Sequence, residues 1–331
     1  MSNLRSAGYY CLAASGSNLP LESCRVKRPF LALVSLSVLV PALRSGHAQA
    51  QNIGYGPLAL TLPASTRMLA MGDIGVSGRD DDVIFYNPAQ LFIARGTSFS
   101  LTRLSETARG GTMSTVLRLG PGAIGFGANY LEYQVTPLSY PFEPGDVIDP
   151  NFALGTSAVG ALGYAQVYRG IRFGAAAKYA MDAVDIERFG KLYGDFGIAR
   201  DFRGGRYNTA LSVQHVGTAL SRGSDRIQAP TTVTLGGATS RQLGPLDGAA
   251  TVGVSYSEVD EVTAGGGAEI SWSWLVGYSI AARAGAHQAR QGGDTEFMGG
   301  LGFTADRMTL DVAVHRLPGD RAGYRAGIRI R

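Results

Sequence analysis

The sequence of 331 residues predicts an all-β protein: a transmembrane antiparallel β-barrel of about fourteen strands, preceded by an export signal and a plug segment. Three observations support this prediction. Apolar and polar residues alternate with a period of two from residue 96 onward, the connections between the alternating stretches are long and short in turn, and Trp272 and Trp274 stand on one face near the end of a stretch. A composition of 45% hydrophobic and 17% charged residues excludes a disordered chain.

Residues 1–50 are predicted to be a secretory signal peptide. The basic pair Lys27-Arg28 precedes the uncharged, mostly apolar stretch 29–43, and residues 48–50 (Ala-Gln-Ala) form a small-residue cleavage site. This order is typical of an exported protein, and the apolar stretch is shorter than the roughly 20 residues that a membrane-spanning helix needs. Because the order begins only at Lys27, a start codon downstream of Met1 also fits the sequence. We expect a protein of the bacterial outer membrane, surrounded by its lipid.

The predicted signal also holds the net charge of the chain and both cysteines. It contains five of the 30 basic and one of the 26 acidic residues, so residues 51–331 carry a net charge of zero although the whole chain is +4. A neutral chain has no overall attraction to nucleic acid. Since Cys11 and Cys24 both precede the cleavage site, we expect no disulfide, thiolate nucleophile or cysteine metal site in the exported part.

Residues 51–95 do not alternate, and we expect them to fold into the barrel as a plug. A barrel interior widens with strand number, and about eight strands are already just filled by their own side chains, so a wider lumen needs another occupant. Asn87 can cap a short helix that begins at Pro88, because its side chain accepts a backbone N–H and proline lacks one. The run 80–82 (Asp-Asp-Asp) lacks the spacing of a calcium-binding loop, so we interpret it as a solvated acidic turn.

The motifs of this stretch resemble those of a known family. Residues 65–72, with Arg67, Met71 and Gly72, lead through the acidic run to residues 86–91, with Asn87 and Pro88. This ordered set is similar to the N-terminal segment of the FadL-like outer membrane barrels, transporters of long-chain fatty acids and hydrophobic compounds, and above all to their PorV/PorQ branch. The resemblance implies a fourteen-stranded barrel with an inward-folded hatch, whose motif residues here are Arg67, Met71, Gly72, Asn87, Pro88 and Ala89.

The chain departs from the family pattern at two places. Asp73 stands where a second glycine is usual, which bears on the local turn of the hatch. The chain ends in Arg329-Ile330-Arg331, without the terminal aromatic residue that is common in such barrels.

The barrel is predicted to occupy residues 96–331. Residues 171–182 alternate most clearly, with Phe173 and Tyr179 on one face and Lys178 and Asp182 on the other. The predicted strands are 96–104, 112–119, 123–133, 156–168, 171–183, 192–202, 207–216, 231–240, 248–257, 262–274, 275–286, 295–305, 307–316 and 322–331, and no Gly, Pro or Asn marks the boundary between Trp274 and Leu275.

The alternation also assigns side chains to the two faces of the barrel wall. We expect Phe173, Tyr179, Val312, Val314 and Ile328 to contact lipid. The charged residues expected to face the lumen carry both signs, which favours salt-bridged packing around a plug over a selective ion path; they are Arg172, Lys178, Asp182, Asp195, Asp201, Asp311, Arg325 and Arg329.

The lengths of the connections favour a membrane barrel over a soluble sandwich, which alternation alone also fits. The first, third, fifth and seventh connections span 105–111, 134–155, 184–191 and 217–230, whereas the even ones span 120–122, 169–170, 203–206 and 241–247. A membrane barrel has tight turns at its periplasmic rim and longer loops outside. By this parity both ends of the barrel lie at the periplasmic rim.

Sequence motifs for catalysis are absent. The chain has no G-x-S-x-G, H-E-x-x-H or P-loop, and Gly120-Pro121-Gly122 is followed by an alternating strand rather than a dinucleotide-binding helix. We therefore expect no enzymatic activity, no cofactor, no metal site and no nucleic-acid partner.

Two functions of different class remain. One is a non-enzymatic partner protein, like the PorV-type members that hold secreted cargo or secretion-system components at the cell surface in type IX secretion. The alternative is a FadL-like passive channel for hydrophobic small molecules. The proline-rich connection 134–155 bears on both, since Tyr140, Phe142 and Phe152 are candidates to contact a ligand or a partner. The resemblance to the PorV/PorQ branch favours the partner protein.

Overall fold

The computed structural model describes residues 57–135, 153–184, 187–217, 220–222, 225–227, 229, 231–257, 261–288, 295–317 and 321–331. The predicted signal peptide, the first residues of the predicted plug (51–56) and the candidate loop residues Tyr140, Phe142 and Phe152 lie outside the described residues. The expectations attached to them stay predictions.

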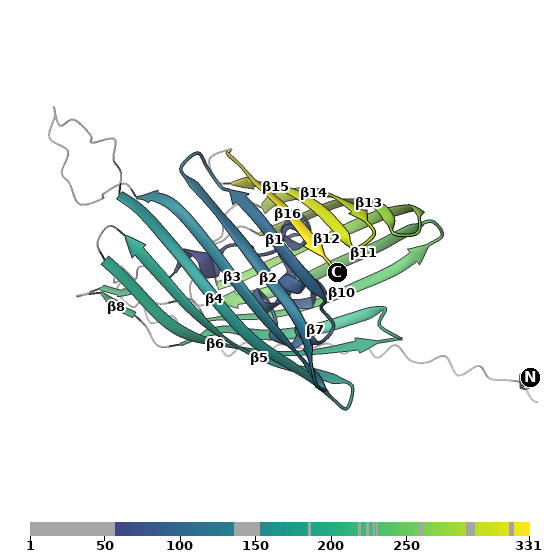
Figure 1. Ribbon diagram of the computed structural model, residues 1–331, viewed down its shortest axis with the longest axis horizontal. Coiled ribbons are helices and arrows are strands. Elements are labelled where there is room, and N and C mark those ends of the chain that lie inside the picture. The colour runs from purple at the N-terminus through teal and green to yellow at the C-terminus, as the bar shows by residue number, and fades with distance from the viewer. Residues whose placement is uncertain are drawn as a thin grey trace, which may run out of the picture. The chain divides into compact units, whose positions relative to one another are not determined.

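Fourteen antiparallel strands close into a barrel, as predicted (Figure 1). Each wall strand pairs with the wall strands that come before and after it in the chain. β1 closes the ring against β16, with Thr97 opposite Ile330. The wall strands are β1 (Gly96–Arg103), β2 (Ala108–Leu119), β3 (Gly122–Val135), β4 (Ala153–Tyr168), β5 (Ile171–Val184), β6 (Glu187–Phe202), β7 (Tyr207–Val216), β10 (Thr232–Leu243), β11 (Leu246–Ser257), β12 (Glu261–Leu275), β13 (Tyr278–Gln288), β14 (Thr295–Ala305), β15 (Met308–Leu317) and β16 (Arg321–Ile330). A separate two-stranded ribbon consists of β8 (Leu220–Arg222) and β9 (Asp225–Ile227).

Tight turns join every second pair of wall strands, so they gather at one rim together with the start of β1 and the end of β16. The predicted sorting of connections is confirmed at this rim, where the turns span 120–121, 169–170, 203–206, 244–245, 276–277 and 306–307. Toward the other rim several strands are longer than predicted. β2 begins at Ala108 rather than residue 112 and β6 at Glu187 rather than 192, because ladder pairing continues beyond the alternating residues.

The predicted strand boundary between Trp274 and Leu275 is wrong. β12 runs through Leu275 and β13 begins at Tyr278, so the turn consists of Val276 and Gly277. Gly277 has a φ of 85°, a left-handed conformation that glycine adopts without a steric penalty. The apolar run Leu275-Val276 continues into the turn, which is why alternation alone misplaced it.

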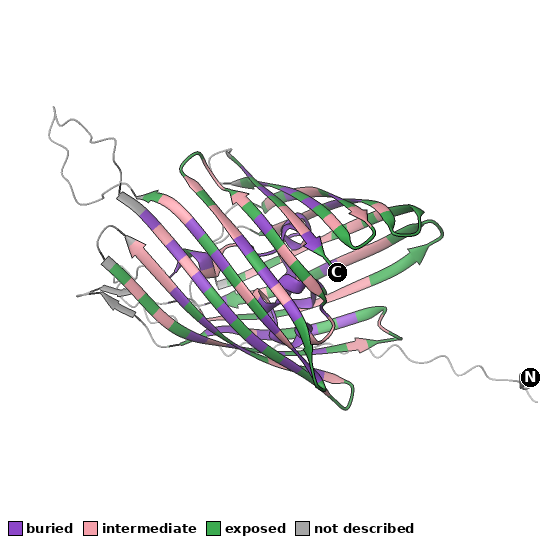
Figure 2. Ribbon diagram, in the orientation of Figure 1, coloured by how far each residue is buried: buried purple, intermediate pink, exposed green. Residues whose placement is uncertain are grey.

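The two faces of the wall are separated as expected. Figure 2 shows buried and exposed residues alternating along the strands. Phe173, Tyr179, Val312 and Val314 are exposed on the outer face, and Ile328 is half-buried. The lumen-facing set is buried except for the half-buried Asp182 and Asp201.

Aromatic residues collect on the outer face near the tight-turn rim. Trp274 stacks on Phe303 with ring centroids 6.3 Å apart and contacts Trp272 and Tyr278. At the turn between β4 and β5, elsewhere on this rim, the Arg169 guanidinium lies over the Tyr168 ring. Such rings with cationic neighbours are typical of a membrane interface, as predicted for the two tryptophans. None of the helices in the described part of the chain is long and apolar enough to cross a membrane.

The residues before the barrel, 57–95, are called here the N-terminal segment. They form five short helices: α1 (Leu58–Thr61), α2 (Thr66–Ala70) and the 3-10 helices η1 (Gly75–Ser77), η2 (Asp81–Phe85) and η3 (Pro88–Phe92). The helices contact strands on opposite sides of the ring: α1 lies against β3 to β5, α2 against β13 to β16, η1 against β7 and β10, η2 against β1 to β4, and η3 against β3 to β6. The segment therefore lies across the lumen (Figure 1). That it closes the lumen to solutes stays a prediction.

Candidate functional site

Asn87 and Pro88 form the helix start that their sequence predicts. The Asn87 Oδ1 accepts a hydrogen bond from the Ala89 backbone N–H at 3.0 Å, and Pro88 is the first residue of η3. The Asn87 amide also donates to the Val76 carbonyl at 3.1 Å, which joins η3 to η1. Asn87 thus caps one helix and ties it to another.

Arg67 is the centre of a buried ion network between the N-terminal segment and the wall. Its guanidinium donates two hydrogen bonds of 2.8 Å to Glu269 on β12 and one of 3.1 Å to Asp80. Asp80 in turn pairs with Arg329 and Arg331 at the end of the last strand. Buried charges are stable only when they are paired, and here the pairs with Glu269, Arg329 and Arg331 join the segment to the barrel.

Two further wall residues extend this network and were missed from the sequence. Arg283 on β13 pairs with both Glu269 and Asp311, and Asp311 also binds Arg329 at 2.6 Å. Glu269 and Arg283 stand directly opposite each other in the β12–β13 register. The predicted boundary between Trp274 and Leu275 places Glu269 opposite Ile280 instead, so the pair could be found only once the turn was known to be Val276 and Gly277.

The acidic run 80–82 is not a solvated turn, so that interpretation is wrong. Its three carboxylates are at most 7% exposed, because η2 packs against the wall; Asp80 pairs there with Arg329 and Arg331, and Asp81 accepts a hydrogen bond from Ser114. Burial raises the pKa of Asp80, but Arg329, Arg67 and Arg331 outweigh it and hold that pKa well below its usual range. Burial, together with Asp81 and Asp80, raises the pKa of Asp82 to about 7. Among the described residues no group of His, Cys, Asp or Glu is arranged to hold a metal ion.

Gly72 and Asp73 make the turn in which the chain departs from the family pattern. Both are left-handed, with φ of 87° and 53°, and a Cβ on Gly72 would meet the Gly266 and Ala286 carbonyl oxygens. Aspartate tolerates this conformation better than most residues. Its carboxylate accepts a hydrogen bond from the Tyr86 hydroxyl at 2.8 Å, so the position where glycine is usual holds a side chain with a partner.

Glycines of the wall allow the N-terminal segment to approach closely. A Cβ on Gly174 would meet the Pro88 backbone, and one on Gly285 would meet the backbone of Met71 and Gly72. A Cβ at other wall glycines around the ring would likewise meet side chains or backbone of the segment. These glycines are Gly125, Gly127, Gly163, Gly197, Gly236, Gly253, Gly267, Gly300 and Gly327. The motif residues Met71, Gly72, Pro88 and Ala89 therefore lie where the segment touches the wall backbone.

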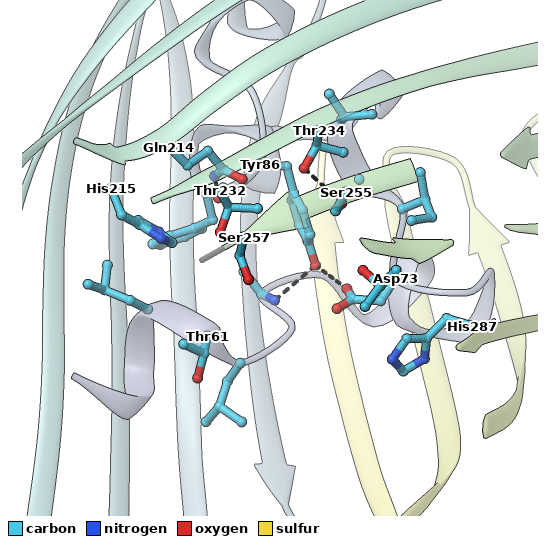
Figure 3. Close-up of a pocket in the computed structure, with 18 of the residues that line it drawn as sticks. Thr61, Asp73, Tyr86, Gln214, His215, Thr232, Thr234, Ser255, Ser257 and His287 are labelled. Carbon is cyan, nitrogen blue, oxygen red and sulfur yellow. Dashed lines mark hydrogen bonds between the residues drawn. The ribbon is translucent and has the colours of Figure 1, made fainter. Parts of the chain in front are cut away.

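A cavity of about 140 Å³, called here the chamber, lies between the segment and the wall (Figure 3). Its wall residues stand at the ends of β7, β10, β11, β12 and β13 that are remote from the tight turns, which places the chamber on the long-loop side of the segment. The polar residues that the wall contributes are Gln214, His215, Thr232, Thr234, Ser255, Ser257, Thr263 and His287. The larger residues that the segment contributes are Leu60, Thr61, Leu62, Asp73, Ile74, Val76, Phe85 and Tyr86. Four small residues from the two parts complete the lining.

Sequence reasoning did not find the chamber. The pattern that could have indicated it is a pair of hydroxyl residues on one face of each of two consecutive strands. These are Thr232 and Thr234 on β10 and Ser255 and Ser257 on β11, which the strand register places opposite one another. The Thr234 and Ser255 hydroxyls are 2.9 Å apart.

A bulge between β6 and β7 positions the chamber residues of β7. The pairing shifts between Gly194 and Phe196, and His215 adopts a φ of 59°. The displaced His215 N–H donates to the Asp195 carboxylate at 2.8 Å, and Gln214 donates to the Phe85 carbonyl at 2.5 Å. A bulge commonly redirects a side chain. Here Gln214, beside the shifted pairing, hydrogen-bonds to Phe85 of the N-terminal segment.

Solved structures of transport proteins share this fold. The Ralstonia pickettii toluene transporter TbuX is 15% identical, with a TM-score of 0.53 over 84% of this chain and 98% of that one. The Pseudomonas putida toluene transporter TodX is 13% identical, with a TM-score of 0.53 over 84% of this chain and 96% of that one. The monoaromatic hydrocarbon channel CymD is 12% identical, with a TM-score of 0.50 over 81% and 95%.

At these identities the likeness shows the fold alone. No protein-family model matches the sequence, and no curated protein is similar to it. The expectation of a FadL-like barrel is thus confirmed as a fold, whereas membership of the PorV/PorQ branch stays a prediction.

Proposed function

We propose that the protein is a passive outer membrane channel for small hydrophobic molecules. The observation that carries the proposal is the chamber, a ligand-sized cavity between the N-terminal segment and the wall of a barrel that shares its fold with toluene transporters. The tight turns would face the periplasm, so the chamber would receive its ligand from outside. The N-terminal segment would act as the plug that forms the floor of the chamber.

This proposal replaces the partner protein that the sequence favoured. Solved structures that share the fold include transporters and channels of hydrocarbons. The connection that was expected to contact a partner lies largely outside the described residues, so nothing in the structure favours that function. We propose a non-enzymatic role for the same reason as before, the lack of a catalytic motif.

Uptake of labelled toluene by cells carrying the protein in an outer membrane without other hydrocarbon channels tests the function. Uptake should exceed that of cells with an empty vector, and Thr234→Trp should return it to the vector level by filling the chamber. Val233→Trp, on the lipid face of the same strand, should leave uptake unchanged. A heat-modifiable gel band establishes that both variants are folded. Wild-type uptake equal to that of the vector would overturn the proposal.

A further inference from the structure

We infer that the outer face of β4 to β7 binds one anionic phospholipid, such as phosphatidylglycerol, with its phosphate at the tight-turn rim and an acyl chain in a groove of the wall. The inference goes beyond the channel function and depends only on the barrel lying in a membrane. Its grounds are a patch of exposed arginines, an apolar groove beside it and the strand register that joins the two.

Three arginines, called here the arginine patch, stand at the tight-turn rim of these strands. Arg169 lies in the β4–β5 turn, Arg200 near the end of β6 and Arg203 in the β6–β7 turn. All three are exposed, and each guanidinium lies within 5.7 Å of the centre of an exposed aromatic ring. The rings are those of Tyr168, Phe202 and Tyr207. A ring attracts a guanidinium to its face and leaves the N–H groups free for an acceptor.

The arginine patch has an excess of positive charge. In the part of the chain that the structure describes, none of its arginines pairs with a carboxylate. Asp201 lies between Arg200 and Phe202 in the chain but faces the lumen, where Arg172 binds it at 2.6 Å. A guanidinium matches the geometry of a phosphate, which it binds with two parallel hydrogen bonds. A lipid with an ammonium group would bring a second cation to the patch and be repelled.

An apolar groove of about 510 Å³ lies on the outer face of the same four strands. Its lining is apolar except for Gln166 and the Tyr164 hydroxyl. Gly174, Ala175 and Gly197 are small and leave space between the larger side chains. The groove is therefore suited to a hydrocarbon chain.

The strand register places the groove directly beside the arginine patch. Arg200 lies opposite Ile171, and this row continues to Tyr168 on β4. The next outward-facing row lines the groove and consists of Gln166, Phe173, Ile198 and Leu211. Because a strand rises about 3.3 Å per residue, the two rows are about 7 Å apart. One molecule with a phosphate head and an acyl chain spans this distance.

A phospholipid fits this arrangement better than a soluble anion does. The aromatic rings of the patch mark the level of the membrane interface, where lipid phosphates lie. Within the membrane an acyl chain gains no hydrophobic free energy from the groove, but it gains van der Waals packing there. A soluble phosphate compound would contact the arginines alone and leave the groove unused.

Native mass spectrometry of the purified protein in a neutral detergent tests the inference. Palmitoyl-oleoyl phosphatidylglycerol competes with phosphatidylethanolamine that has the same chains. We expect one phosphatidylglycerol to be retained at least about fivefold more tightly, the effect of one arginine near an anionic headgroup. Arg169→Gln with Arg200→Gln should abolish this preference. Arg241→Gln with Arg307→Gln removes the same charge elsewhere at this rim and should keep it.

Filling the groove tests the position of the acyl chain. Ala175→Trp places an indole among the side chains of the groove and should weaken retention of phosphatidylglycerol several-fold. Ala177→Trp is the matched control, because it lies on the same face of β5 but outside the groove. It should retain the lipid as the wild-type protein does.

Three outcomes would overturn the inference. They are equal retention of the two lipids by the wild-type protein, an equal loss of preference in the two double variants, and equal retention by the two tryptophan variants. Heat modifiability establishes that each variant is folded, and Arg200→Gln alone serves if its double variant does not fold. Toluene uptake measures the channel function separately, so either result can fail without the other.

Discussion

Asp82 and Asp80 lie two residues apart and respond in opposite ways to burial. The guanidinium groups around Asp80 keep it charged, whereas Asp82 has two acidic neighbours and a pKa raised to about 7 from its usual 3.8. The folded state therefore binds the Asp82 proton more tightly than the unfolded state does. Its contribution to stability is complete below about pH 4 and is lost as the pH rises through 7.

Asp82→Asn should accordingly raise stability at pH 8 and leave it nearly unchanged at pH 4. A gain on the order of 1 kcal/mol would correspond to about 2–4 °C in the unfolding midpoint of a domain of this size. The measurement is the temperature at which the folded gel band disappears, at the two pH values. Glu106→Gln, an exposed loss of charge, is the control and should shift neither midpoint. A gain of equal size at both pH values would refute the assignment.

Gly174 is an inward-facing position where the backbone of the N-terminal segment leaves no room for a side chain. Gly174→Ala should cost about 1–3 kcal/mol, as overpacking of a filled core does. Gly160→Ala on the neighbouring strand is the matched control, since a Cβ there meets nothing within 4 Å. Thermal unfolding of the two variants should differ, and equal midpoints would mean that the segment yields freely at this contact.

At the scale of elements, ion pairs hold α2 and η2 against the last strands of the barrel. Arg67 connects Glu269 of β12 with the carboxylate of Asp80, the residue before η2, and Arg329 and Arg331 connect the same carboxylate with the end of β16. The chain end thus meets its own N-terminal segment.

Arg67→Met should destabilise the protein by about 3–5 kcal/mol, because it leaves Glu269 and Asp80 short of a buried partner. Arg109→Met breaks the exposed pair with Glu132 and should cost less than about 1 kcal/mol. Urea unfolding of the two variants in the same detergent measures the difference. Similar costs would show that the Arg67 network contributes no more than a surface pair.

The outer faces of the strands form the second feature at this scale. Val312→Arg should cost about 2–4 kcal/mol if this half-exposed residue of β15 contacts the middle of the bilayer, and Val276→Arg in the tight turn should cost about 0–1 kcal/mol. Unfolding in lipid vesicles measures both. Equal tolerance of arginine at the two positions would remove the argument for a membrane-embedded wall.

At the scale of the whole molecule, the N-terminal segment and the barrel form one packed structure. Its helices contact strands on all sides of the ring, and the wall glycines bring its backbone against the strands. Among the described residues, the chamber on the long-loop side and smaller gaps elsewhere lie between the two parts. A ligand that enters from the long-loop rim therefore meets the segment before it can reach the tight-turn rim.

Deletion of residues 55–90 should open a water-filled conductance in planar bilayers, because the wall side chains alone do not fill a barrel of this width. The barrel should remain heat-modifiable on gels, since its closure depends on strand pairing and not on the segment. The full-length protein should conduct little under the same conditions. If the deletion variant conducts no more than the full-length protein, the lumen is closed by the wall or its loops.

The alternating residues of the sequence determined the strands, their order and the two faces of the wall. A strand exposes successive side chains to opposite sides, so the pattern can be read without knowing the fold. The capping of η3 by Asn87 was equally local. The sorting of loops needed only the positions of turns, and the misplaced turn after Trp274 arose where the apolar run Leu275-Val276 continues into it.

Only the tertiary structure decided which wall residues hold the N-terminal segment and where the chamber lies. A partner of Arg67 lies 202 residues and one of Asp80 251 residues further along the chain. Asp80, Asp81 and Asp82 look like a solvated turn in sequence because local reasoning cannot see distant arginines. The chamber likewise consists of strand ends and turns that become neighbours only when the ring closes around the segment.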